Sequence, residues 1–190
     1  MNIFDDLISI DKNGNFSYNK WVEWNHFLIP NTQKTLRNFM RKLLAFFGHC
    51  KKCSALDGCY LLENNRPQQP LHINCDCTRK TISLNQVRLK ATAICPLIKF
   101  TDYIFKNKDK KIIYQSWGFT IEDSEKLQKH LEQEARKNYI SGNYILKNLD
   151  EYGQRLSIPV NLSGNIFYSG WLLCPEGLIR NTTPFGGWVK

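Results

Sequence analysis

The clearest pattern of apolar positions lies in the second half of the chain. Four apolar residues recur at every fourth position: Leu127, Leu131, Ala135 and Tyr139. This spacing is typical of one buried face of an α-helix. Thr120 precedes Asp123 by three residues, as in a capping box, and Gly142 follows the last apolar position. The pattern predicts a helix over residues 121–140.

From residue 156 the apolar period changes to two. Apolar residues alternate with polar ones at Leu156, Ile158, Val160 and Leu162. Turn residues at 163–165 and 175–177 separate this segment from two further strands, over 166–173 and 178–183. Pro159 lacks an N–H and places its strand at a sheet edge. The second half is therefore predicted as α+β, with a helix packed on an antiparallel meander of three or four strands.

The first half contains one helical stripe. Its apolar positions are Leu36, Phe39, Met40, Leu43, Leu44 and Phe47. The spacing predicts an amphipathic helix that ends at Gly48. Basic residues lie off the stripe at Arg37, Arg41 and Lys42. Such a helix can lie on phosphate, and a solvated face over a buried stripe is the alternative.

Weaker patterns surround that helix. Residues 1–30 mix polar turns with aromatic side chains, which predicts irregular structure with a short helix around 20–27. Residues 78–96 are predicted as a connector that contains a short strand from Thr81, and Cys95-Pro96 marks a break. We expect a domain 1–95 with a helix and a cysteine–histidine region, and a domain 96–190 with the α+β fold.

The charge balance favours a polyanionic partner. The chain has 190 residues, with 26 Lys and Arg against 17 Asp and Glu, a net charge of +9. This balance predicts a nucleic-acid partner, while charge for solubility alone is the alternative. No window reaches 18 apolar residues, so no membrane span is expected. The first six residues lack a basic signal region, so we expect a protein of the host cytoplasm.

Five of the seven cysteines fall within 28 residues, among them Cys50 and Cys53. This C-x₂-C pair brings two thiolates to one cation, and a second pair completes a tetrahedral Zn²⁺ site. His72, Cys75 and Cys77 are three candidates for the last two ligand positions. The predicted structural zinc site is thus drawn from Cys50, Cys53, His72, Cys75 and Cys77, and thiols clustered by chance are the alternative. Cys59, Cys95 and Cys174 are predicted to be buried as small apolar residues. If this region packs beside the basic helix, four cations extend the same surface: Lys51, Lys52, Arg79 and Lys80.

This region also carries a resemblance. Cys50-x₂-Cys53-x₂-Leu56-Asp57-Gly58, followed by Pro70-x-His72-x₂-Cys75-x-Cys77, resembles the cysteine–histidine element of phage Mu F-type head morphogenesis (minor head) proteins. The resemblance covers residues 50–80. It implies shared ancestry with phages or other mobile elements, and it allows an association with the virion.

The second half lacks the signatures of common catalytic sites but holds a basic and hydroxyl set. The members are Lys108, Lys110, Lys111, Arg155, Tyr168, Arg180, Thr182 and Thr183. Cations of this kind hold a scissile phosphate without a metal, and a base such as His130 helps the ribose 2′-hydroxyl to attack. Bases are expected to stack on Trp171 or Trp188. In the alternative interpretation, Arg155 and Arg180 only pair with acids and His130 is a surface residue.

A second resemblance covers about 90 residues. Lys99-Phe-Thr-Asp102-Tyr103, Trp117-Gly118-Phe119, Tyr152-Gly-Gln-Arg155, Ser169-Gly-Trp171 and Ile179-Arg-Asn-Thr182 look like small toxin domains of the barnase–EndoU–colicin–RelE group of RNases. The order of a helix followed by a meander is similar. The resemblance implies catalytic roles for Arg155, Arg180 and Thr182, and lesser roles for His130 and Lys111.

Two hypotheses follow from the sequence. The first is a phage or mobile-element protein with a structural zinc site and an RNase-like toxin domain, for which RNA is favoured over DNA and an immunity protein is a further partner. The second is a non-enzymatic, zinc-stapled binding module, either a phage-head accessory or an inhibitor that binds a host protein or nucleic acid.

Overall fold

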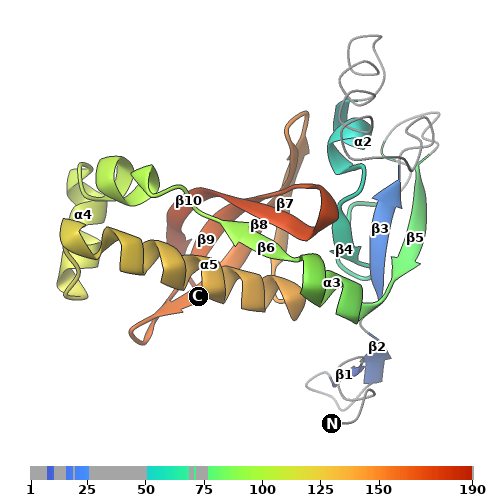
Figure 1. Cartoon of the computed structure of the whole chain (residues 1–190), viewed down its shortest axis with the longest axis horizontal. Helices are drawn as coiled ribbons and strands as arrows, with labels where there is room; N and C mark the ends of the chain where they lie inside the picture. Colours follow the sequence, from blue (N-terminus) through green and yellow to red (C-terminus); the bar gives the residue numbers. More distant parts are fainter. Residues whose placement is uncertain are drawn as a thin grey trace.

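The computed structural model describes residues 8–10, 16–18, 20–25, 51–68, 71 and 77–189. The helices are α2 (Lys51–Leu56), α3 (Leu84–Lys90), α4 (Lys108–Ser116) and α5 (Ser124–Ile140), with a π-helical turn η1 (Lys99–Ile104) and 3₁₀ turns η2 (Ile121–Asp123) and η3 (Pro175–Gly177). The strands are β1 (Ile8–Ile10), β2 (Phe16–Tyr18), β3 (Trp21–Asn25), β4 (Tyr60–Leu62), β5 (Thr78–Ile82), β6 (Thr92–Ile94), β7 (Ile145–Asp150), β8 (Gly153–Leu162), β9 (Asn165–Leu173) and β10 (Leu178–Trp188). The fold mixes helices and sheets, as the predicted α+β class requires (Figure 1).

The largest sheet has five strands in the order β6-β10-β9-β8-β7. Strands β7 to β10 form the predicted antiparallel meander, and β6 adds to β10 in parallel. Strand β6 has only three residues and lies more than 80 residues before β10. The local sequence pattern therefore did not predict this strand or its pairing.

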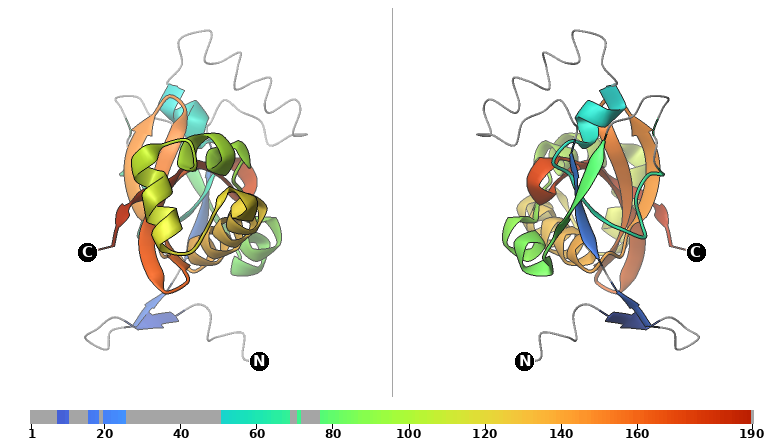
Figure 2. Two further views of the ribbon diagram at one scale, coloured as in Figure 1. Left: turned by 90° about the vertical axis from the view of Figure 1, so that its left-hand side faces the viewer. Right: turned by 90° about the vertical axis from the view of Figure 1, so that its right-hand side faces the viewer.

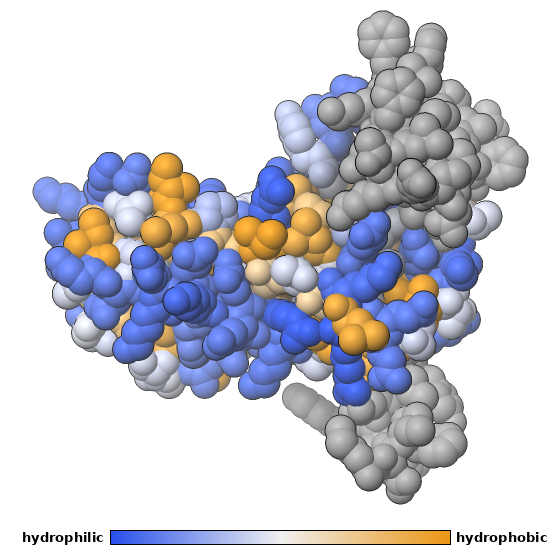
Figure 3. Space-filling model, viewed as in Figure 1, coloured by the Kyte–Doolittle hydropathy of each residue, from blue (hydrophilic) through white to orange (hydrophobic). Residues whose placement is uncertain are grey.

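Helix α5 covers one face of this sheet. The predicted helix over 121–140 is confirmed as η2 followed by α5, and its four periodic apolar residues are all buried. It packs against β8 and β6, and its outward surface is largely hydrophilic (Figure 3). In the side views of Figure 2 helices α3, α4 and α5 lie on one side of strands β7, β8 and β9.

The edge position predicted for the strand that contains Pro159 is wrong. Strand β8 lies between β7 and β9. However, β7 pairs with β8 only from Gly153 to Ser157, so Pro159 has a strand neighbour on one side alone, at Tyr168. Its missing N–H therefore falls where β7 has already ended. On that side the Asn138 side chain donates to the Pro159 carbonyl at 3.0 Å.

A three-stranded sheet, in the order β4-β3-β5, corrects two predictions for the first half. The short helix expected around 20–27 is instead strand β3, and its tryptophans Trp21 and Trp24 are buried. The connector expected over 78–96 contains β5, α3 and β6. Ser83 and Gln86 form a capping box at the start of α3. The three-residue spacing from Ser to Gln is a sequence signature of such a helix start.

The boundary between 1–95 and 96–190 stays a prediction, but contacts cross it. Strand β6 pairs with β10, and the Tyr139 hydroxyl of α5 donates to the Tyr60 carbonyl at 2.6 Å. Trp21 and Trp171 belong to one cluster of buried hydrophobic residues. Among the described residues, no helix has the length and apolar character needed to cross a membrane.

Candidate functional site

Two arginines of the predicted catalytic set share one face of the five-stranded sheet. Arg155 of β8 and Arg180 of β10 both pair with Leu172 of β9, the strand between them. Directly opposed residues of antiparallel strands project to the same side. The two side chains therefore leave the same side of the sheet, two strand spacings or about 10 Å apart. We call this side, opposite α5, the open face.

Burial along the strands distinguishes the two sides. On β8 and β9 the residues facing α5 are buried, whereas the alternate residues are partly or fully exposed. The open face thus carries exposed polar groups on a rigid scaffold. They are Arg155, Ser157, Asn161, Tyr168 and Arg180.

Asp150 holds one of the arginines. Its carboxylate oxygen Oδ2 accepts from Arg155 Nε at 3.1 Å, and Oδ1 accepts from the backbone N–H groups of Tyr152 and Gly153. Burial acts to raise the pKa of Asp150, but these hydrogen bonds and the Arg155 charge outweigh it and hold the pKa below its usual value. Asp150 is therefore ionised at neutral pH, and it orients the Arg155 guanidinium through one nitrogen only.

The predicted residues Thr182 and Thr183 lie at an irregularity of β10. The register shifts between Asn181 and Thr183, so one extra residue is inserted opposite β9. A Cβ built on Gly170, an open-face position of β9, would lie 3.0 Å from Thr182 Oγ1 and 3.3 Å from Thr183 Cβ. Both threonine side chains are thus beside Gly170. The Lys99 ammonium of η1 donates to the Thr182 carbonyl at 3.0 Å.

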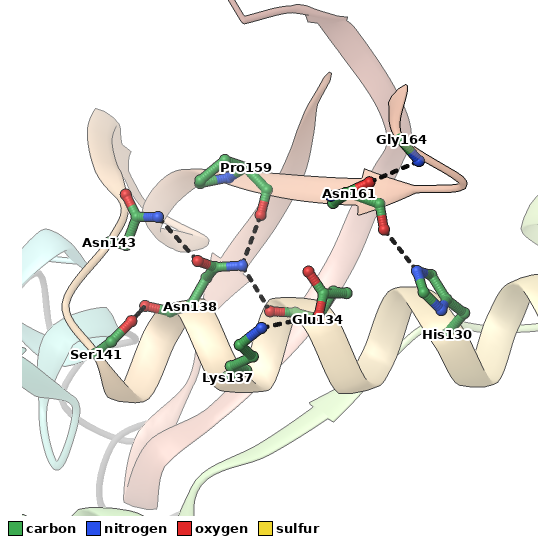
Figure 4. Close-up of polar contacts among 9 residues, drawn as sticks. All are labelled: His130, Glu134, Lys137, Asn138, Ser141, Asn143, Pro159, Asn161 and Gly164. Atoms are coloured by element: carbon green, nitrogen blue, oxygen red, sulfur yellow. Dashed lines mark hydrogen bonds and ion pairs between the residues drawn. The ribbon is translucent and has the colours of Figure 1, made fainter. Parts of the chain in front are cut away.

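The structure separates His130 and Lys111 from this group. His130 projects from α5, on the covered side of the sheet, and its Nε2 lies 2.6 Å from the Asn161 carbonyl (Figure 4). Lys111 is exposed on α4, at the end of the molecule away from the three-stranded sheet (Figure 1). Neither residue joins Arg155 and Arg180 on the open face.

The expected stacking role of Trp171 is wrong. Its side chain is fully buried among the inward-facing residues of β9. Trp188 is 53% exposed, but it pairs with the buried Phe167 and contacts Phe185 and Trp117, so it belongs to the opposite side from Tyr168. Tyr168 is the aromatic residue that lies on the open face.

Acids partly offset the basic surface predicted in the first half. Lys51 pairs with Glu151 at 2.5 Å and Arg79 pairs with Glu63 at 2.6 Å. Lys52 and Lys80 are exposed. Arg37, Arg41 and Lys42 lie outside the described residues, as does the amphipathic helix predicted to end at Gly48. Ion pairing of this kind lowers the positive field that a polyanion would meet.

Two of the five predicted zinc ligands lie in the described part of the chain. Cys53 of α2 and Cys77, just before β5, are both buried. Cys77 precedes Thr78, which pairs with Asn25 at the end of β3, and Gly58 bonds to Trp24 at that same end. Cys50, His72 and Cys75 fall outside the described residues. Within the described ranges, no three His, Cys, Asp or Glu side chains gather as a metal site would require.

The remaining cysteines agree with the apolar role predicted for two of them. Cys59 and Cys95 are fully buried. Burial, followed by the Glu132 charge, raises the pKa of the Cys95 thiol to about 12. Cys174 is only partly buried, and its thiol lies 3.7 Å from the Leu172 carbonyl.

Sequence reasoning missed several residues that shape the open face. Asp150 is the last residue of β7, a strand without an alternating apolar pattern. Its hydrogen bonds from the N–H groups of Tyr152 and Gly153 depend on the β7–β8 turn. Gly170, Ser169 and Asn181 read as ordinary strand residues. Their signal was compositional, since buried polar residues and a glycine within an apolar strand mark bulges or close approaches.

Comparison with known proteins adds no relative. No family model matches the sequence, and neither a curated protein nor a solved structure matches it.

Proposed function

We propose that this chain is a phage or mobile-element protein whose second half acts on RNA through the open face of its five-stranded sheet. One observation carries the proposal, namely the cross-strand row in which Arg155 and Arg180 flank Leu172 on an exposed surface. Guanidinium groups bind phosphate through two parallel hydrogen bonds. Two of them on one rigid face fit a phosphodiester backbone better than a small neutral ligand.

Tyr168 supports single-stranded RNA over duplex DNA as the ligand. Tyr168, Gly170 and Leu172 are alternate residues of β9, so Tyr168 lies on the same face as the arginine row. An aromatic ring beside cations gives a surface on which an unpaired base can stack. Readers of duplex DNA instead place a helix or ribbon in the major groove.

Cleavage would proceed without a metal. The arginines stabilise the charge that develops on the phosphate oxygens. Asp150 is the carboxylate beside Arg155 and takes the proton of the 2′-hydroxyl as this oxygen attacks phosphorus. The products are a 2′,3′-cyclic phosphate and a 5′-hydroxyl, whose oxygen takes its proton from water. His130 has no part in this mechanism because α5 holds it on the other side of the sheet.

The direct test is to incubate the purified protein with total tRNA in EDTA and to follow the cleavage products. We expect cleavage that Arg155→Ala or Arg180→Ala reduces at least tenfold. The matched control is Arg136→Ala, since Arg136 lies on α5 and donates to the Ala91 and Arg88 carbonyls. Intact RNA at high protein excess would remove the enzymatic claim.

The second candidate function is binding of RNA without cleavage. The ion pair between Asp150 and Arg155 favours it, because a carboxylate engaged by a guanidinium is a weakened base. In that case the RNA stays intact but binds with a salt-dependent affinity, and expression in bacteria is not toxic. A zinc-stapled module that meets a host protein predicts neither cleavage nor salt-dependent RNA binding.

We further propose a structural Zn²⁺ site held by Cys50 and Cys53, with two further ligands from His72, Cys75 and Cys77. The support is that Cys53 and Cys77 are both buried, that Cys77 precedes β5 at the end of β3 where Gly58 also bonds, and that the spacing resembles the Mu F-type element. Bound zinc would contribute on the order of 10 kcal/mol to folding. Metal analysis of reduced protein should find about one equivalent of zinc, and Cys53→Ser should lower stability far more than Cys174→Ser.

A further inference from the structure

The bulge in β10 is held by side chains from two other elements, η1 and β9. Asn181 pairs with Trp171, but Thr183 pairs with Gly170, so Thr182 is the extra residue. The Thr182 carbonyl accepts from Lys99 Nζ at 3.0 Å, and the Thr183 carbonyl accepts from Ser169 Oγ at 3.1 Å. A bulge that only ended the strand would not need side chains from η1 and β9 to hold both of its carbonyls.

Asn181 organises the bulge from the covered side of the sheet. Its side chain is 3% exposed, and its Nδ2 donates to Ser169 Oγ at 3.0 Å, to the Gly170 carbonyl at 3.2 Å and to the Thr183 carbonyl at 3.4 Å. Two of these partners are backbone acceptors, so the amide orientation is fixed. Burying the polar side chains of Asn181 and Ser169 in a largely apolar layer costs stability, which indicates that the bulge has a role beyond packing.

Gly170 has no side chain and so leaves room for the Thr182 and Thr183 side chains. The nearest groups to a Cβ at this position are Thr182 Oγ1 and Thr183 Cβ, on the open face. Bulges recur beside active sites, where they redirect side chains. Here the bulge places two threonine side chains side by side, two residues along β10 from Arg180.

We propose that this bulge is a phosphate subsite, in which the Thr182 and Thr183 hydroxyls donate to the non-bridging oxygens of one phosphodiester group next to Arg180. Asn181 and Ser169 are positioning residues that act through the bulge, and Gly170 keeps the subsite open. The inference rests on the proposed function and names where on the open face a phosphate binds.

The test uses the full-length protein and a labelled single-stranded RNA. Thr182→Val and Thr183→Val remove the hydroxyls but keep the branched shape, and each should weaken binding about tenfold, the loss of one charge-assisted hydrogen bond. Gly170→Ala should do the same, because its Cβ would displace the Thr182 hydroxyl. Thr182→Ser should retain binding, and Thr81→Val on β5 of the three-stranded sheet is the matched control.

Asn181→Ala tests the positioning role. It should reduce RNA binding to the level of the double valine variant without reducing it further when the two are combined. Since this variant loses buried hydrogen bonds, its folding is checked by circular dichroism and by urea denaturation. Additive effects of Asn181→Ala and the double valine variant would overturn the assignment of Asn181.

A second readout separates the subsite from the proposed function. Inorganic phosphate, titrated into ¹⁵N-labelled protein, should shift the amide resonances of 181–183 in the wild type and not in the double valine variant. If RNA binds and depends on Arg155 and Arg180 but not on the threonines, the subsite is wrong and the proposed function stands. If phosphate shifts these resonances but RNA does not bind, the subsite stands and the proposed function fails.

Discussion

The two faces of the five-stranded sheet are built from the same strands but serve opposite purposes. Toward α5, strands β8 and β9 present a continuous buried layer that includes Ile158, Phe167 and Trp171. On the open face the alternate positions carry arginine, tyrosine and serine, which stay partly exposed. Successive side chains of a strand point to opposite faces. Each of these strands therefore contributes every second residue to the buried core and the residues between them to the open face.

The largest expected effect compares neighbours on β9. Trp171→Ala removes a fully buried ring and should lower the free energy of unfolding by about 3–5 kcal/mol. Leu172→Ala, on the open face, should cost about 1 kcal/mol or less. Urea denaturation monitored by circular dichroism measures both values. Equal losses would mean that the open face is covered as well.

Thiol reactivity should differ nearly as strongly between two cysteines at the ends of this sheet. Burial raises the pKa of Cys95 from an ordinary value of 9.0 to about 12, so its thiolate fraction at neutral pH falls about a thousandfold. We expect iodoacetamide to modify Cys174 in the folded protein and to leave Cys95 unmodified until urea unfolds the chain. Peptide mass spectrometry reads each site, and rapid native labelling of Cys95 would contradict its burial.

The arginine pair of the open face should affect RNA binding and leave the fold intact. Arg155→Ala with Arg180→Ala should weaken RNA binding about a hundredfold and reduce its salt dependence. The urea midpoint should change little because Arg180 is exposed and the Asp150–Arg155 pair contributes under about 1 kcal/mol. Fluorescence anisotropy at two salt concentrations is the measurement. Unchanged affinity in the double variant would move the RNA site elsewhere.

The smallest effect concerns the Asp150–Arg155 pair and acid. Because the pKa of Asp150 is lowered in the folded state, its ionised form stabilises the fold above the unfolded pKa of about 3.9. That contribution disappears as the pH falls through the folded pKa. Asp150→Asn should therefore be less stable than the wild type at pH 7, by under about 1 kcal/mol for so exposed a pair, and the difference should vanish near pH 3. A difference that grows on acidification would reverse the sign of this coupling.

The parts of the fold that were predicted from sequence are those that local periodicity determines. The 121–140 helix and the strands that contain Leu156 and Trp171 depend on neighbours within one turn or one hairpin. The helix expected around 20–27 failed because Trp21 and Trp24 are three residues apart, a spacing that also suits a helix. Strand β3 pairs with β4 and β5, which lie about 35 to 60 residues further along the chain. The periodicity of a short segment carries no information about partners at that distance.

The candidate site divides in the same way. Arg155 and Arg180 were selected by residue type, and the hairpin register that brings them to one face follows from the turns at 163–165 and 175–177. His130 was selected for its chemistry alone, and the direction in which α5 packs excludes it from that face. The bulge at Asn181 depends on side-chain hydrogen bonds across β9 and β10, which no spacing along the chain encodes.

Strand β6 has a consequence for any shortened or processed form of this protein. It supplies the outer neighbour of β10 at residues 178–180, so a fragment that starts at residue 96 would leave that backbone unpaired and open to strand addition by another molecule. A fragment that keeps the five-stranded sheet complete must therefore begin before Thr92. Proteolytic cleavage between β6 and η1, followed by loss of β6, would move the sheet edge from β6 to residues 178–180 of β10.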